Sequence, residues 1–293
     1  MAFSLQTYLP RRLRKKSVPV PVVRLTGTIM ATSGPLRPSL SLAGVAGILD
    51  KAFAMKEAPA VAISINSPGG SPVQSRLIFQ RIRDLAAEKK KPVLVFVEDV
   101  AASGGYMIAC AGDEIIADPS SIVGSIGVVS GGFGFVEALQ KLGVERRVHT
   151  SGRNKAVLDP FRPEREEDVA HLLALQREIH QTFIDLVTSR RGDRLADHDD
   201  LFTGQFWSGL RGLELGLVDH LGDLRGVLRE RFGEHVKPVV VQPARGFIGR
   251  RLAGQSLEGG SAPGASLELA GAGAVERLAA LAEERLAWSR FGL

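Results

Sequence analysis

Short apolar runs alternate along this chain with segments in which apolar residues recur every three or four positions. The runs are rich in Val and Ile, as buried strands are, and they lie at 22–25, 61–65, 93–97, 114–117, 126–129 and 144–148. The segments with helical spacing predict helices over 45–56, 73–89 and 135–142. This alternation predicts an α/β fold, in which crossover helices join largely parallel strands.

The longest helical pattern covers residues 164–190. Its apolar residues form one broad face, which predicts a helix that packs on the outside of the domain. The triplet Arg191-Gly192-Asp193 is expected to end this helix. The apolar face consists of Val169, Leu172, Leu173, Leu175, Ile179, Phe183, Leu186 and Val187.

The composition changes near residue 244, after which Gly, Ala, Ser and Pro dominate. Such a composition is typical of a linker, here predicted over 244–273. Apolar residues at helical spacing then predict an amphipathic helix over 274–293, which is expected to dock on the body of the protein or on a partner. The folded domain is therefore predicted over 20–243, after an N-terminal arm over 1–19.

The overall composition fits a soluble globular protein. Of the 293 residues, 44% are hydrophobic and 24% are charged, which allows a large core and disfavours wholesale disorder. The net charge of +5 is modest, and the basic residues do not alternate with aromatic ones, so nucleic acid is not an expected partner. The single cysteine, Cys110, lies in an apolar segment and cannot form an intramolecular disulfide.

The N-terminal arm is basic, because residues 1–49 contain no Asp or Glu and residues 11–16 read Arg-Arg-Leu-Arg-Lys-Lys. No apolar segment of the length of a secretory h-region follows this cluster, so neither a cleavable signal peptide nor a transmembrane helix is predicted. A transit peptide would have to fit into about 18 residues. The arm is either solvated or a peripheral contact with an anionic membrane surface, and the expected location is the cytoplasm.

One serine stands out where a strand pattern gives way to glycines. Ser103 follows the predicted strand at 93–97 and precedes Gly104 and Gly105, after which a helical pattern begins. Amides at the start of a helix are free to donate, so the Gly104 amide can stabilise an oxyanion beside the Ser103 hydroxyl. The turn suits a nucleophile, although a small residue that caps the helix gives the same local pattern.

A serine nucleophile needs a base, and histidines are the usual partners. Four of the six histidines lie on charged helical or loop segments, and none lies in a glycine-framed or apolar turn. The acidic group at 197–200 is not expected to bind a metal, because adjacent side chains on one short loop rarely converge on one ion. The residues therefore predict no metal, no cofactor and no histidine in the site.

Lys155 is the other candidate base, in a loop bracketed by apolar runs. Lowering a lysine pKa from about 10.4 to about 7 requires roughly 4.6 kcal/mol, so such a base needs a dry, enclosed site. Ser125 lies in a charge-free run and is suited to hold the neutral amine. Gly70 lies in a second glycine turn, after the strand at 61–65, and its amide is the candidate for a second oxyanion donor.

Together these segments resemble the signal peptide peptidase A family of Ser/Lys peptidases, over about residues 20–235. Four ordered motifs are far more specific than any one of them. They are Ile65-Asn66-Ser67-Pro68-Gly69-Gly70, Ala101-Ala102-Ser103-Gly104-Gly105-Tyr106, residues 117–127 around Ser125, and Gly152-Arg153-Asn154-Lys155; Gly216-Leu217-Val218-Asp219 also matches.

The resemblance implies a ClpP/crotonase-like fold, a layered β-sheet with crossover helices. It implies Ser103 as nucleophile, Lys155 as general base, Ser125 as the residue that orients Lys155, and Gly70 and Gly104 as oxyanion donors. Family members form rings in which a neighbouring subunit supplies the base loop. The resemblance therefore implies a homo-oligomer acting on peptides such as signal-peptide remnants, with Ser103 and Lys155 beyond hydrogen-bond reach in one protomer.

Two departures and two alternatives remain. Family members commonly carry an N-terminal membrane anchor, which is not expected here, and the tail beyond about residue 244 lies outside the resemblance. The same fold class includes acyl-CoA hydratases and isomerases, whose acid/base carboxylates have no obvious counterpart in this sequence. An inactive ring that only binds peptides is the other alternative.

Overall fold

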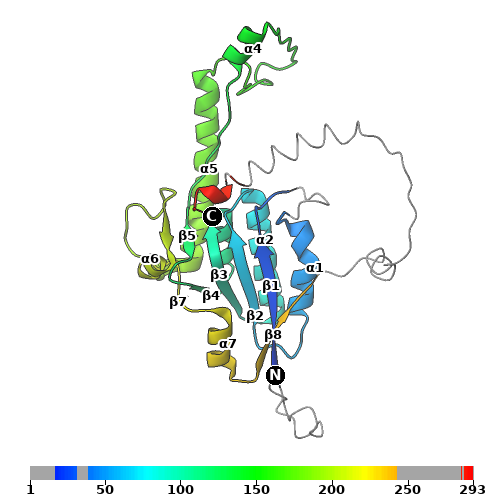
Figure 1. Cartoon of the computed structure of the whole chain (residues 1–293), viewed down its shortest axis with the longest axis vertical. Helices are drawn as coiled ribbons and strands as arrows, with labels where there is room; N and C mark the ends of the chain where they lie inside the picture. Colours follow the sequence, from blue (N-terminus) through cyan, green and yellow to red (C-terminus); the bar gives the residue numbers. More distant parts are fainter. Residues whose placement is uncertain (1–16, 32–38, 243–284, 286, 293) are drawn as a thin grey trace, which may run out of the picture.

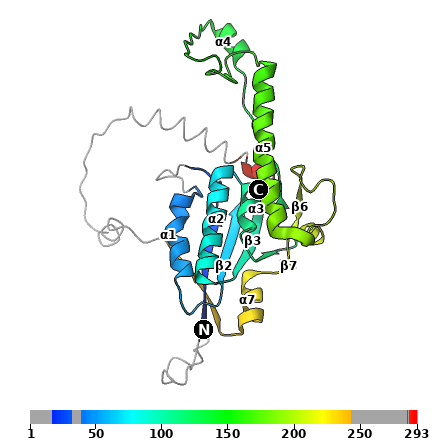
Figure 2. The ribbon, with the colours of Figure 1, turned by 180° about the vertical axis from the view of Figure 1, so that it is seen from behind.

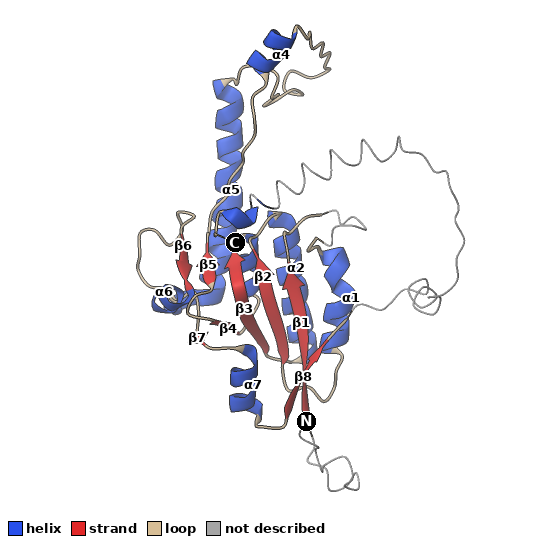
Figure 3. Cartoon of the chain, viewed as in Figure 1, coloured by secondary structure: helices blue, strands red, loops and turns tan. Residues whose placement is uncertain are grey.

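A computed structural model describes residues 17–31, 39–242, 285 and 287–292. Its centre is a sheet in the order β6-β5-β3-β2-β1-β8, with β4 beside β3 and β7 beside β4 (Figure 3). Every strand pair is parallel except β5 with β6. The strands are β1 (Val18–Thr26), β2 (Val61–Ser67), β3 (Val93–Ala102), β4 (Glu114–Ala117), β5 (Ile122–Gly124), β6 (Phe206–Ser208), β7 (His220–Leu221) and β8 (Val236–Val240).

Alternating side chains of the strands fill two cores, one on each face of the sheet. On one face, Val23, Ile63 and Val95 pack with residues of the helices α1, α2, α3 and α5. On the other face, Val22 and Phe96 pack with residues of α7. The helices are α1 (Leu42–Phe53), α2 (Pro72–Lys89), α3 (Gly104–Ala109), α4 (Val136–Leu142), α5 (Glu166–Arg191), α6 (Gly209–Glu214) and α7 (Leu224–Phe232), with a 3₁₀ helix, η2 (Gly192–Arg194), after α5.

The predicted α/β class is confirmed, and so are the central strands and the four predicted helices, with shifted boundaries. The strands predicted at 126–129 and 144–148 are wrong. The first segment follows Ser125, where the chain leaves the sheet, and the second lies beyond α4, away from the sheet. An apolar β-branched run becomes a strand only where a neighbouring strand pairs with it.

An arm extends from the body of the molecule (Figures 1 and 2). It consists of residues 130–178, which include α4 and the N-terminal half of α5. Of the predicted apolar face of α5, Phe183 and Val187 are buried, whereas Leu173 and Leu175 are 45% and 48% exposed. The C-terminal half of the helix thus packs on the domain as predicted, whereas its N-terminal half extends into the arm.

The last described residues return to the sheet. Phe291 is buried against Val100 and Ala102 of β3, and Trp288 and Ile122 pack at the edge of this cluster. Residues 287–292, here called the C-terminal turn, are helical over 287–289 and end in a turn, and they lie on the end of β3. Most of the predicted arm at 1–19 and the linker at 244–273 lie outside the described residues, and β1 already begins at Val18. Within the described ranges, every helix is too short or too polar to cross a membrane.

Candidate active site

Ser103 occupies a strained turn between β3, which ends at Ala102, and α3, which begins at Gly104. Its backbone has φ 52° and ψ −121°, a conformation that residues with a Cβ rarely adopt. The amide of Ser103 donates to the carbonyl of Gly124 at 2.8 Å, and the Ser103 carbonyl accepts from Met107 at 3.0 Å. A strained strand-to-helix turn of this kind exposes a serine hydroxyl at the end of a sheet.

Positive φ also marks the second predicted serine. In the part of the chain that the structure describes, four non-glycine residues have positive φ, namely Lys90, Ser103, Ser125 and Leu158. Lys90 ends α2 in the left-handed conformation common at helix ends. Each such residue costs about 1–3 kcal/mol, and strain of this kind tends to gather at functional sites.

The glycine turn after β2 lies directly against the serine turn. A Cβ at Gly69 would be 2.8 Å from the Cβ of Ser103, and one at Gly70 would collide with the carbonyl of Ile29. Only glycine therefore allows this approach. Among the described residues, neither the Gly70 amide nor the Gly104 amide has a hydrogen-bond acceptor. Both amides remain available to a ligand.

Ser125 lies beside Ser103 because β3 and β5 are parallel neighbours. Ala102 pairs with Gly124, so the two serines are the next residues on adjacent strands. Ser125 is buried, and its amide donates to the carbonyl of Gln205 at 2.7 Å. The structure thus brings the predicted nucleophile and the predicted orienting residue to the same edge of the sheet.

Both serines line one pocket of about 260 Å³. None of the described residues in its lining is Asp or Glu. The pocket is lined by Ser103, Ser125, Gly127, Val128, Val129, His180, Thr203, Gly204 and Arg290.

Lys155 is not among these residues, and no hydrogen bond joins it to Ser103 in the described structure. It lies exposed in the segment between α4 and α5, and this segment belongs to the arm (Figure 1). The amide of Leu158 in this segment donates to Asp168 at 3.4 Å. Asp168 lies about 18 Å along the axis of α5 from His180, which lines the serine pocket. The chain therefore places its predicted base well away from its own predicted nucleophile.

His180 is a pocket residue that the sequence analysis did not predict. Its Nε2 lies 3.0 Å from the carbonyl oxygen of Ile126, which can only accept, so this nitrogen carries a proton. The sequence led us to expect a site that uses no histidine; His180 lines the pocket, and its role there is addressed in the Discussion. Helical spacing in the sequence could have identified His180 as a residue that faces the body, because His180, Phe183 and Val187 lie at i, i+3 and i+7 on the buried side of α5.

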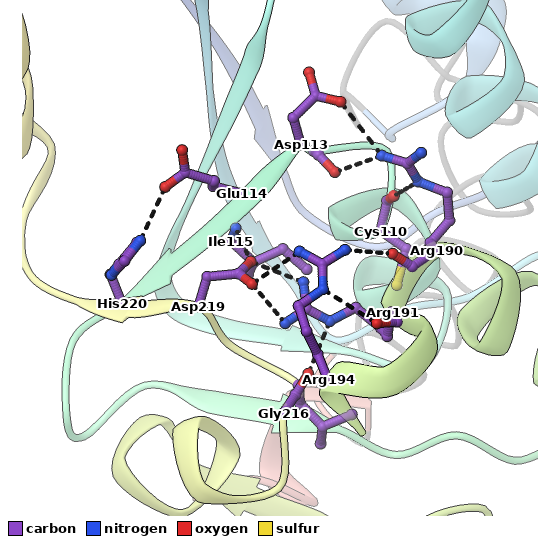
Figure 4. A network of polar contacts seen from close by, with 12 residues as sticks. Cys110, Asp113, Glu114, Ile115, Arg190, Arg191, Arg194, Gly216, Asp219 and His220 are labelled. Atoms are coloured by element: carbon purple, nitrogen blue, oxygen red, sulfur yellow. Dashed lines mark hydrogen bonds and ion pairs between the residues drawn. The ribbon is translucent and has the colours of Figure 1, made fainter. Parts of the chain in front are cut away.

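A buried ion-pair network joins the C-terminal end of α5 to the body of the protein (Figure 4). Arg191, which is 3% exposed, donates to both carboxylate oxygens of Asp219 at 2.7 and 3.0 Å and to the carbonyl of Gly216 at 2.8 Å. Arg194 and the amide of Ile115 also donate to Asp219. Burial raises the pKa of Asp219, but the hydrogen bonds from Arg191 and Ile115 outweigh burial and hold the pKa below its ordinary value. The motif at 216–219 thus anchors the arm.

The same region buries the cysteine. Arg190 donates to the carbonyl of Cys110 at 2.9 Å, and the hydroxyl of Tyr106 donates to the carbonyl of Leu217 at 2.8 Å. Burial raises the pKa of the Cys110 thiol to about 12. A thiol with this pKa stays protonated and is a poor nucleophile.

Residues 86–234, about half of the chain, match the model of Peptidase family S49. The chain belongs to this family. The match spans the serine turn, the arm and the anchoring motif, so the S49 region contains most of the candidate site. The predicted resemblance to signal peptide peptidase A is confirmed at the level of the family.

Several curated proteins are similar to this S49 chain. "Na(+)/H(+) antiporter NhaA" of Brucella abortus is 60% identical over 289 residues, 99% of this chain and 39% of that protein. "Protease 4" of Haemophilus influenzae is 34% identical over 74% of this chain and 35% of its own length. "Serine protease SPPA, chloroplastic" of Arabidopsis thaliana is 30% identical over 70% of this chain and 31% of its own length.

The chain therefore spans about two fifths of the Brucella protein and about one third of the two proteases. The Brucella protein is named for transport, and most of its length lies outside the alignment. The names of the other two proteins agree with the family that matches this chain. Their alignments cover 70% and 74% of this chain, against 99% for the Brucella protein.

Proposed function

We propose that the protein is a serine peptidase in which Ser103 attacks the peptide carbonyl. The observation that carries this proposal is the strained backbone of Ser103, which lies against the glycine turn at residues 69–70, together with the Gly70 and Gly104 amides, which have no acceptor among the described residues. In this mechanism the amides stabilise the tetrahedral oxyanion, and water then hydrolyses the acyl-enzyme. Family S49 membership and the names of the protease relatives support the reaction class.

We propose Lys155 of a neighbouring copy as the base. Lys155 is exposed in the segment between α4 and α5, whereas a lysine base needs a site removed from water. Contact between the arm of one copy and the serine pocket of another would bury the amine next to Ser103. Ser125 would then accept or donate a hydrogen bond that orients this amine. Apolar side chains that face solvent on and beside the arm support such a contact: Val129, Phe133, Phe135, Leu142, Val144, Leu173 and Leu175.

The proposed substrates are peptides in extended conformation, with signal-peptide remnants as one source and cytosolic peptides as the other. The hydratase or isomerase alternative gains no support from the pocket, because no carboxylate lines it. Peptidase activity of the wild type, compared with Ser103→Ala and Lys155→Ala, separates these cases. Each variant should lose about 10³-fold or more in kcat/KM. Full activity in both variants would reject the assignment, and turnover of thioesters but not peptides would favour the alternative.

Mixing the two inactive variants tests whether the site is shared between copies. If Ser103 and Lys155 act from neighbouring subunits, a mixture unfolded and refolded together regains about one quarter of wild-type activity, because random assembly pairs an intact serine with an intact lysine at that frequency. If both residues act within one chain, the mixture stays inactive. The control is each variant refolded alone.

A further inference from the structure

The C-terminal turn holds a basic side chain at the candidate nucleophile. Phe291 is buried against Val100 and Ala102, and Ala102 directly precedes Ser103. The ring of Phe291 also contacts Phe206 edge to face, with centroids 5.1 Å apart. Two apolar anchors, Phe291 and Trp288, thus fix the position of the residues between them.

Arg290 lies between these anchors and lines the pocket that contains Ser103 and Ser125. Its guanidinium lies 5.9 Å from the centroid of the Phe291 ring, and the side chain is exposed. Within the described residues, no Asp or Glu forms an ion pair with Arg290. In the described part of the chain, the cation in the serine pocket thus has no carboxylate partner.

We propose that Arg290 is a specificity-determining residue that binds a carboxylate of the peptide in the serine pocket. The inference rests on the proposed function of Ser103. A guanidinium binds a carboxylate through two parallel hydrogen bonds, and this geometry favours Arg over other basic residues. Since none of the described residues that line the pocket is acidic, we assign the carboxylate that pairs with Arg290 to the ligand.

Two sources can supply this carboxylate, namely an acidic side chain near the scissile bond or the α-carboxylate at the end of the peptide. A set of fluorogenic peptides separates them, with Glu or Gln placed in turn at each position and with free or amidated C-termini. A preference for Glu over Gln at one position identifies the side chain. A preference for the free over the amidated terminus identifies the α-carboxylate.

The decisive variant is Arg290→Gln in the full chain. We expect kcat/KM for the preferred carboxylate peptide to fall about tenfold, while its neutral counterpart is cleaved as before, because only the charge-assisted hydrogen bonds are lost. Arg285→Gln is the matched control, because Arg285 precedes the same turn and does not line the pocket. Phe291→Ala should reproduce the Arg290→Gln result, because it releases the turn from β3.

Three outcomes would overturn the inference. The first is equal cleavage of charged and neutral peptides by the wild type, and the second is an equal effect of Arg290→Gln on both kinds of peptide. The third is faster cleavage of every peptide by Phe291→Ala, which would show that the turn blocks the pocket. Peptide binding to Ser103→Ala, with and without Arg290→Gln, separates this inference from the proposed function. If the protein binds peptides charge-selectively but the wild type cleaves none, the peptidase proposal is rejected and the role of Arg290 is retained. If the wild type cleaves peptides without a charge preference, the role of Arg290 is rejected and the peptidase proposal is retained.

Discussion

At the scale of single residues, the backbone marks the candidate site more sharply than the side chains do. The motif around Ser103 was recognisable from its glycines, but the φ of 52° depends on hydrogen bonds to β5, which is distant in sequence. His180 and Arg290 reach the same pocket only through the tertiary fold. Local sequence therefore predicts the turn chemistry, while the remaining pocket residues follow from contacts between distant segments.

The glycine turn after β2 leads to a first prediction. Gly70→Ala should abolish peptidase activity and lower the free energy of unfolding by at least about 1 kcal/mol, because a Cβ there collides with the carbonyl of Ile29 at positive φ. Gly47→Ala in α1 is the control, because open space surrounds that position, and it should be neutral or stabilising. Denaturant unfolding and kcat/KM measure both effects. An active Gly70→Ala enzyme would contradict the oxyanion role.

The hydrogen bond of His180 leads to a second prediction. His180→Ala should lower kcat/KM by less than about tenfold, because its protonated Nε2 is bound to the carbonyl of Ile126 and cannot accept the Ser103 proton. Lys155→Ala, measured in the same peptide assay, should be far more damaging. If His180→Ala instead lowers kcat/KM more than Lys155→Ala does, His180 is the base and the lysine is not.

At the scale of secondary-structure elements, strand pairing explains which predictions are confirmed. The run at 93–97 is apolar at every position and the run at 61–65 at all but Ser64, and both lie at the centre of the sheet, where each strand has neighbours on both sides. The run at 126–129 has no charged residue but follows β5, where the described chain forms no further strand. Residues 144–148 are Val-Glu-Arg-Arg-Val, so only the two terminal valines of this run are apolar. The short β5, β6 and β7 have no comparable local signal, because tertiary pairing defines them.

The anchor of α5 leads to a third prediction. Asp219→Asn should lower the free energy of unfolding by about 3–5 kcal/mol, because it leaves the buried guanidinium of Arg191 without its carboxylate. Glu137→Gln is the control, because its ion pair with Lys141 on α4 is exposed, and it should cost less than about 0.5 kcal/mol. Equal effects of the two variants would show that the buried pair does not hold the arm.

The pKa shift of Asp219 determines the direction in which the free energy of unfolding changes with pH. The pKa of Asp219 is lowered in the folded protein, so its ionised form stabilises the fold above the unfolded pKa of about 3.9. This stabilisation is lost as the pH falls through the lower, folded pKa. The difference in unfolding free energy between wild type and Asp219→Asn should thus be full at neutral pH and shrink below about pH 4. A constant difference from pH 3 to pH 7 would contradict the assignment.

At the scale of the whole molecule, the arm separates two parts of one proposed site. The sheet edge supplies Ser103, Ser125 and the two amides, while the segment of the arm between α4 and α5 carries Lys155. Apolar side chains exposed along the arm are costly for an isolated chain in water, and contact with a second copy would remove this cost. Assembly and catalysis are therefore expected to fail together when the arm is altered.

Leu142 offers the sharpest test, because it lies in α4 and is 75% exposed, so its replacement leaves the core untouched. Leu142→Asp should reduce the particle to the 31.4 kDa protomer, as measured by light scattering, and should abolish peptide cleavage without changing the melting temperature. Leu210→Asp is the matched control, since Leu210 is 52% exposed on α6 of the body, and it should leave both mass and activity unchanged. If the Leu142→Asp protein is assembled and active, α4 does not form the contact between copies. A monomeric but fully active protein would show that Ser103 does not need a base from another copy.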